Sequence, residues 1–89
     1  MKDKVLVKLF VSDLNSCYDV FIPVNEVLWK VKTLIVMAIS DISGGALSKE
    51  GHYSLINKET GQVYNLNSIL IDTDIRNATE LILISSPQI

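Results

Sequence analysis

A single stretch of helical periodicity, at residues 25–42, is the feature that most restricts what this chain folds into. Apolar residues recur there at spacings of three and four, which is the pattern of one buried helix face. The segments on either side alternate between apolar and polar residues, the pattern of strands. With 89 residues in all, this order predicts one sheet packed on one helix. The expected core stripe of the helix consists of Leu28, Val31, Ile35, Ala38, Ile39 and Ile42.

Two strands are expected before the helix, at residues 5–11 and 17–22, with turn-forming residues at 12–16 between them. Pro23 is expected to end the second strand, because proline has no N–H to donate to a ladder. Asn25 is the expected N-cap of the helix. Gly44-Gly45 is expected to end the helix, since glycine adopts the left-handed conformation without steric cost.

Three further strands are expected after the helix, at residues 53–57, 62–64 and 80–84. A hairpin turn at 58–61 joins the first two, and a single helical turn is expected between residues 66 and 75. The first and last strands are expected to pair in parallel, because the middle of the chain supplies the long crossover such a pair needs. The prediction is therefore one α+β domain over residues 1–89, ordered β-β-α-β-β-β, with its core at about 4–84 and a short tail at 85–89.

The net charge and the cysteine count restrict which partners the chain binds and in which cell compartment it is expected. The net charge is −2 and the eight basic residues are scattered, which argues against nucleic acid as a partner. Cys17 is the only cysteine, so no internal disulfide forms. The N-terminus enters a strand pattern instead of a signal-peptide core, and the apolar runs are too short to span a bilayer. We therefore expect a cytoplasmic protein with no direct membrane insertion.

Two segments resemble the ubiquitin-like superfamily. Residues 70–83 resemble the end of ubiquitin-like domains, where a leucine-x-aspartate turn and an isoleucine precede a polar turn and a Leu-x-Leu strand. Residues 22–35 resemble the strand-to-helix entry of the same superfamily. The resemblance implies the β-grasp fold, in which one mixed sheet packs on a single long helix.

Within the superfamily, the sequence is most like the YukD/EsaB group of bacterial type VII (ESX/WXG100) secretion accessory proteins. The residues that carry this likeness are Glu50-Gly51-His52-Tyr53, Asn57-Lys58 and the stretch 71–83. The resemblance implies other proteins as partners, namely cytosolic domains of a membrane secretion machine. Such partners would hold the chain at the periphery of the cytoplasmic membrane.

The chemistry expected of the chain is binding alone. Conjugated modifiers and carriers need a C-terminal Gly-Gly, whereas this sequence has its glycine pair at 44–45 and Ser85-Ser86-Pro87-Gln88-Ile89 at its end. His52, the only histidine, has no evident nucleophilic partner, and Cys17 lies beside Asp19, which disfavours a thiolate. No catalytic residue, cofactor or metal site is expected.

An apolar surplus predicts where binding occurs. The alternation leaves a set of large apolar residues on the outer face of the sheet, and clustered apolar surface tends to mark interaction sites. By the resemblance, Leu14, Ile56 and Ile84 match the positions of ubiquitin's hydrophobic patch. The alternative is that these residues stand on the surface only because β-branched side chains favour the strand conformation, with no role in binding. The predicted binding face comprises Leu6, Phe10, Leu14, Phe21, Ile56, Ile82 and Ile84.

A second candidate interface lies on the helix, opposite its core stripe. Trp29, Val36 and Met37 occupy positions where an amphipathic helix is usually charged, and Trp and Met are enriched in interface cores. The alternative is that a loop or the tail covers this face.

The sequence thus predicts a non-catalytic, non-conjugated protein-binding module, an accessory or regulatory component of a type VII secretion system, with a weak homo-oligomer among its allowed states. Two alternatives stay open: a ubiquitin-like adaptor unrelated to secretion, and a carrier or modifier whose terminus must first be processed.

Overall fold

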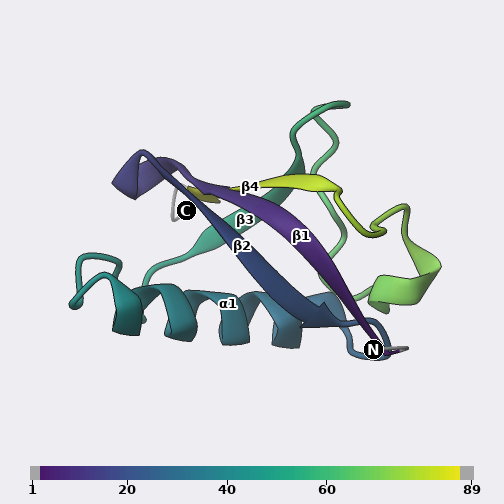
Figure 1. Ribbon diagram of the computed structural model, residues 1–89, viewed down its shortest axis with the longest axis horizontal. Coiled ribbons are helices and arrows are strands. Elements are labelled where there is room, and N and C mark those ends of the chain that lie inside the picture. The colour runs from purple at the N-terminus through teal and green to yellow at the C-terminus, as the bar shows by residue number, and fades with distance from the viewer. Residues whose placement is uncertain (1–2, 87–89) are drawn as a thin grey trace.

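The computed structural model describes residues 3–86 and shows one twisted sheet lying across one helix (Figure 1). The predicted fold class, α+β with a mixed sheet on a single long helix, is confirmed. The elements in chain order are β1 (Lys4–Val11), η1 (Ser12–Leu14), β2 (Ser16–Pro23), α1 (Leu28–Ile42), β3 (Tyr53–Asn57), η2 (Leu70–Asp72) and β4 (Glu80–Ser85), where η1 and η2 are single 3₁₀ turns.

The four strands lie in the order β2-β1-β4-β3. β1 and β4 form the parallel central pair that the sequence predicts, and β2 and β3 pair antiparallel to them at the two edges. Alternate residues of each strand point to the helix, which leaves the other half of the side chains on an outer face. The fully buried inner residues of the sheet are Val7, Leu9, Val11, Leu55, Leu81 and Leu83.

The strand predicted at residues 62–64 is reduced to one bridge, between Val63 and Ile56, so the sheet has four strands and not five. The reason is that the chain is diverted toward the helix directly after this point. The carbonyl oxygens of Leu66 and Ser68 accept hydrogen bonds from the backbone N–H groups of Trp29 and Leu28 respectively, both at 2.8 Å.

The same contact explains why α1 begins at Leu28 and not after the predicted N-cap Asn25. The first N–H groups of a helix have no partner within the helix and need one elsewhere. Here the carbonyl groups of residues 66 and 68 supply it, and Val27 is held extended by a bridge to Ile69. The end of α1 is as predicted, since Gly44 and Gly45 both have positive φ directly after it.

The buried face of α1 differs from the predicted stripe. Ala38 and Ile42 are exposed, whereas Val36 and Ser40 are buried. The Lys32 Nζ donates a hydrogen bond to the Tyr53 carbonyl oxygen at 3.2 Å, which places the Lys32–Val36–Ser40 side of the helix against the start of β3. The opposite flank, which carries Ala38 and Ile42, is consequently left open beside β2.

The predicted tail at 85–89 begins too early. Ser85 is the last residue of β4, and the Ser86 N–H donates to the His52 carbonyl oxygen at 2.8 Å. Residues 87–89 of the predicted tail lie outside the described residues.

Candidate protein-binding site

Five apolar side chains form a row across the outer face of the sheet. Phe10 on β1 is the register partner of both Cys17 on β2 and Ile82 on β4, and Ile82 is the partner of Ile56 on β3. Val63 pairs with Ile56 beyond the edge of β3 and extends the row by one residue. Paired residues of neighbouring strands point to the same face and touch. We call Cys17, Phe10, Ile82, Ile56 and Val63 the apolar row.

A second row lies two residues further along the strands, about 7 Å away, and consists of charges of alternating sign. Lys8 on β1 is the partner of Asp19 on β2 and of Glu80 on β4. Lys58 follows β3 directly, and its Nζ lies 3.9 Å from the Glu80 Oε1. All four side chains are exposed. We call them the charged row, which reads Asp19, Lys8, Glu80, Lys58 from β2 to β3.

The charged row divides the predicted binding face into two parts. Leu6 and Phe21 are register partners on the far side of it, separated from Phe10, Ile56 and Ile82 by Lys8 and Asp19. Phe21 is 65% exposed and Leu6 is 37% exposed, so this pair forms a patch of its own. The predicted face is therefore two apolar patches and not one.

The remaining two predicted residues lie at the η1 end of the sheet. Ile84 is the partner of Ser54, one row beyond the apolar row, and continues it. Leu14 belongs to η1, where it is half-buried and packs against the core. Its side chain is partly exposed, and its role in binding stays a prediction.

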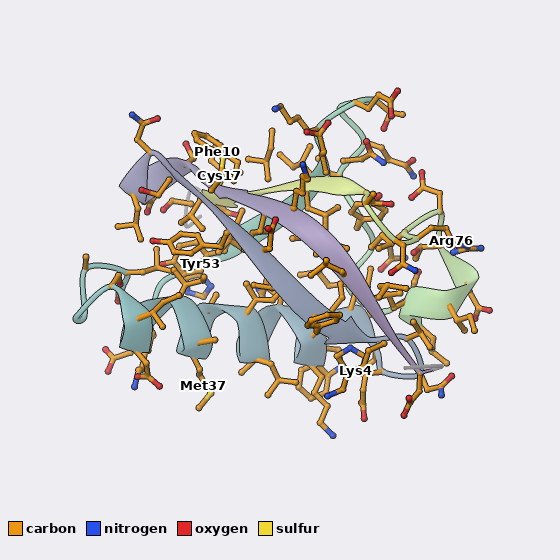
Figure 2. All side chains as sticks on the ribbon, viewed as in Figure 1. Lys4, Phe10, Cys17, Met37, Tyr53 and Arg76 are labelled. Carbon is orange, nitrogen blue, oxygen red and sulfur yellow. The ribbon has the colours of Figure 1, made fainter. Side chains whose placement is uncertain are left out.

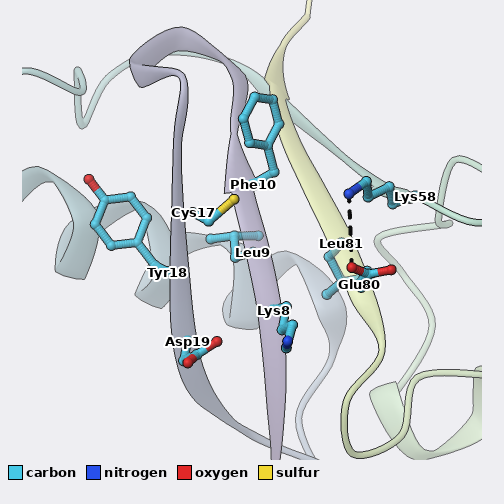
Figure 3. Close-up of a pocket in the computed structure, with 9 residues that line it drawn as sticks. All are labelled: Lys8, Leu9, Phe10, Cys17, Tyr18, Asp19, Lys58, Glu80 and Leu81. Carbon is cyan, nitrogen blue, oxygen red and sulfur yellow. Dashed lines mark ion pairs between the residues drawn. The ribbon is translucent and has the colours of Figure 1, made fainter.

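A hollow of about 340 Å³ lies between the two rows and reaches from β2 across β1 to β4 and Lys58. Figure 3 shows Phe10 and Cys17 at one end of it, with Lys8 and Asp19 at the other and the Lys58–Glu80 ion pair across β4. Cys17, the smallest member of the apolar row, is one of the residues that line the hollow.

The hairpin that carries Val63 is held by a buried polar network. The Asn57 Nδ2 donates to the Tyr64 hydroxyl at 3.0 Å, and that hydroxyl donates to the Asp74 Oδ1 at 2.7 Å. Burial, together with the hydrogen bond to Asp74, raises the pKa of Tyr64 to about 12. The Asn57 Oδ1 also accepts from the backbone N–H groups of Glu59 and Thr60. The network thus fixes the turn that sets Val63 beside Ile56.

No metal site is evident within residues 3–86, since no three His, Cys, Asp or Glu side chains gather there. Asp74, which stands in an Asp-x-Asp sequence, instead accepts the Tyr64 hydrogen bond.

The second candidate interface, on α1, is smaller than predicted. Trp29 is 51% and Met37 is 47% exposed, and Figure 2 shows Met37 on the side of the helix away from the sheet. Val36 is only 5% exposed, because its side of the helix packs against the start of β3, so it is not part of any surface. Exposed Leu34 and Ala38 instead line a depression of about 390 Å³ between α1 and β2.

Two parts of the outer face were not predicted from the sequence. The sequence predicts a short strand at residues 62–64 but no binding role for Val63, although its position after the 58–61 turn sets it opposite Ile56. The charged row could not be recognised, because its four members come from three strands and one turn and meet only through the cross-strand register.

No protein-family model and no curated protein matches the chain. Solved structures do match its fold. The N-terminal ubiquitin-like domain of the 4931431F19Rik protein has a TM-score of 0.66 at 15% identity, over 97% of this chain and 78% of that one. The ubiquitin-like domain of the Mycobacterium tuberculosis type VII secretion system protein ECCD1 has a TM-score of 0.71 at 14% identity, over 92% of this chain and 98% of that one. The fold is the ubiquitin-like β-grasp.

None of the helices within residues 3–86 combines the length and the apolar character that crossing a bilayer requires.

Proposed function

We propose that this ubiquitin-like domain is a non-catalytic protein-binding module, and that it serves as an accessory component of a bacterial type VII secretion system. The observation that supports the binding proposal is the apolar row, which crosses all four strands on the outer face of the sheet. Its partner would be a cytosolic part of the membrane machine.

The layout of the outer face suits recognition. Protein interfaces combine an apolar centre with a polar rim, and a few large side chains near the centre contribute most of the affinity. The apolar row supplies such a centre, and Ile84 widens it toward η1. The charged row flanks it and would orient a partner of complementary charge.

Reversible binding fits the chemistry of the face better than catalysis does. Cys17 and His52 belong to opposite edges of the sheet, on β2 and directly before β3. Three strand spacings separate these edges, about 14 Å, so the imidazole is too far away to activate the thiol. Gly44-Gly45 ends α1 inside the fold, and cleavage there to expose a glycine pair would separate the β1–β2–α1 half from β3 and β4.

The secretion part of the proposal is supported by two likenesses. Residues 50–53, 57–58 and 71–83 resemble the YukD/EsaB group. The fold is similar to the ubiquitin-like domain of ECCD1, a type VII secretion system protein. A gene neighbourhood with WXG100-type substrates and a membrane ATPase would favour this role over that of an adaptor unrelated to secretion.

The test uses the cytosolic domain of the neighbouring type VII membrane ATPase as the binding partner. Ile56→Asp and Ile84→Asp each place a charge in the apolar centre and should weaken binding by at least about 30-fold, the equivalent of about 2 kcal/mol. Met37→Asp on α1 is the matched control, because it adds the same charge on another surface of the domain. Thermal melts verify that all three variants fold.

Binding that is unchanged in both outer-face variants would remove this face from the proposal. Loss of binding in Met37→Asp alone would move the interface to α1.

A further inference from the structure

We infer that the outer face also binds a second copy of this chain, in a symmetric dimer whose two-fold axis runs parallel to the strands between β1 and β4. The inference rests on the proposal that this face is a protein-binding surface, and it names one partner for it. The observation that supports it is the order of charges in the charged row, which is negative, positive, negative, positive across the sheet.

A half-turn about this axis lays two outer faces against each other with the strand order reversed. Asp19 then faces Lys58 of the second copy, and Lys8 faces Glu80. Since the operation is symmetric, Glu80 faces Lys8 and Lys58 faces Asp19 as well. All four contacts join opposite charges, so the row is complementary to its own image.

The alternative two-fold axis, along the row itself, gives the opposite result. It would set Lys8 against Lys8 and Glu80 against Glu80, and like charges across an interface cost several kcal/mol. The charge order therefore selects one arrangement of the two copies.

The apolar row is complementary in the same arrangement. Phe10 faces Ile82 of the second copy, and Cys17 faces Ile56. Cys17 is the smallest member of the apolar row, and Ile56 stands at the end of the row that Val63 widens. Small residues thus meet large ones, as in a well-packed interior.

The strands of the two sheets would run nearly parallel, which is the aligned geometry of stacked sheets, with the strands within about 30° of each other. The face measures roughly 20 Å by 20 Å from strand spacing and rise, so it buries about 800 Å² over both copies. Stable specific interfaces bury about 1,200 Å² or more. The dimer is accordingly weak, and it occupies the same surface as any other partner, so the two associations exclude each other.

Paired charge swaps test this arrangement by sedimentation equilibrium of the full chain, from about 10 μM to about 1 mM. Lys8→Glu turns two attractive contacts into repulsive ones, and Glu80→Lys does the same. Each variant alone should therefore self-associate at least about tenfold more weakly than the wild type. Raising the salt concentration should weaken the wild-type dimer, because exposed charge pairs are screened.

Mixing the two variants should restore association, because unlike charges then oppose each other at every position of the charged row. In the mixtures only the Glu80→Lys chain carries a fluorescent label, so that its sedimentation reports the partners of that chain alone. Labelled Glu80→Lys should sediment as a dimer when unlabelled Lys8→Glu is added.

Lys49→Glu is the matched control, because it makes the same charge change on the loop after α1. Alone it should self-associate as the wild type does. A mixture of Lys49→Glu with labelled Glu80→Lys has the same net charges as the mixture of Lys8→Glu with labelled Glu80→Lys. In this control mixture, however, Lys8 of the Lys49→Glu chain faces the lysine that the Glu80→Lys substitution introduces. The labelled chain should therefore associate more weakly with Lys49→Glu than with Lys8→Glu.

A wild-type chain that stays monomeric throughout the range overturns the inference, as does a Lys8→Glu variant that self-associates as strongly as Lys49→Glu. Labelled Glu80→Lys that associates no better with Lys8→Glu than with Lys49→Glu overturns it too. If Ile56→Asp nevertheless abolishes binding of the ATPase domain, the proposed function stands and only the inference of a second copy fails.

Discussion

Replacing Tyr64 with phenylalanine is expected to lower the free energy of unfolding by about 2–4 kcal/mol. The ring stays in place, and only the hydroxyl that joins Asn57 to Asp74 is lost. Asn57 is 6% exposed, so its side-chain amide is left buried without that acceptor, which costs about 1–3 kcal/mol. The Asp74 carboxylate is exposed and regains water, so its part of the loss is limited to the net value of one hydrogen bond, about 1 kcal/mol.

Urea unfolding followed by Trp29 fluorescence measures the effect, and the melting temperature should fall by about 10–20 °C in a domain of this size. A variant within about 0.5 kcal/mol of the wild type would refute the view that this network holds the 58–61 hairpin and Val63 in place.

The same substitution carries a pH signature. Since the pKa of Tyr64 is raised to about 12 in the folded state, the folded chain retains this proton where the unfolded chain releases it. The stabilisation is fully present below pH 10, the ordinary tyrosine pKa, and is lost as the pH rises toward 12. The wild type should therefore lose more stability over this interval than Tyr64→Phe. Tyr53, whose pKa is also raised, remains in both proteins and cancels in the comparison. Equal slopes would contradict the assignment.

Two further predictions concern the core and one turn. Leu83→Ala and Ile35→Ala should each lower the free energy of unfolding in urea by about 2–5 kcal/mol, because both side chains are buried. Leu34→Ala, on the exposed side of α1, is the control, and an equal loss there would mean that α1 is rotated from the described orientation. Gly61→Ala should cost about 1 kcal/mol from backbone strain alone, since Gly61 has φ +76° and nothing lies within 4 Å of the added Cβ; an unchanged melting temperature would show that the turn tolerates an L-residue.

The parts of the fold that follow from local pattern were predictable. Strand alternation predicted an outer face with Leu6, Phe10, Ile82 and Ile84, and the residues between them that face the helix, Val7, Leu9, Leu81 and Leu83, are fully buried. The glycine pair after α1 marked its end, because no other residue adopts positive φ without strain. β3 has the predicted limits, Tyr53–Asn57, since a turn closes it on one side.

The parts that depend on distant contacts were not predictable. The start of α1 is set by carbonyl groups of Leu66 and Ser68, which lie beyond β3 in the chain. The choice between burying Val36 and burying Ala38 depends on where the start of β3 lies relative to the helix. Likewise the charged row depends on which residue of each strand meets which, and one residue of slippage in β2 would replace Asp19 with an inward-facing neighbour.

Titrating the isotopically labelled chain with the type VII ATPase domain, and recording which backbone amide signals change, locates the binding surface directly. We expect the changes to gather on the apolar and charged rows and on Ile84, with Phe10, Ile56, Val63 and Ile82 among the largest. Changes confined to α1, around Trp29 and Met37, with the outer face of the sheet unaffected, would contradict it.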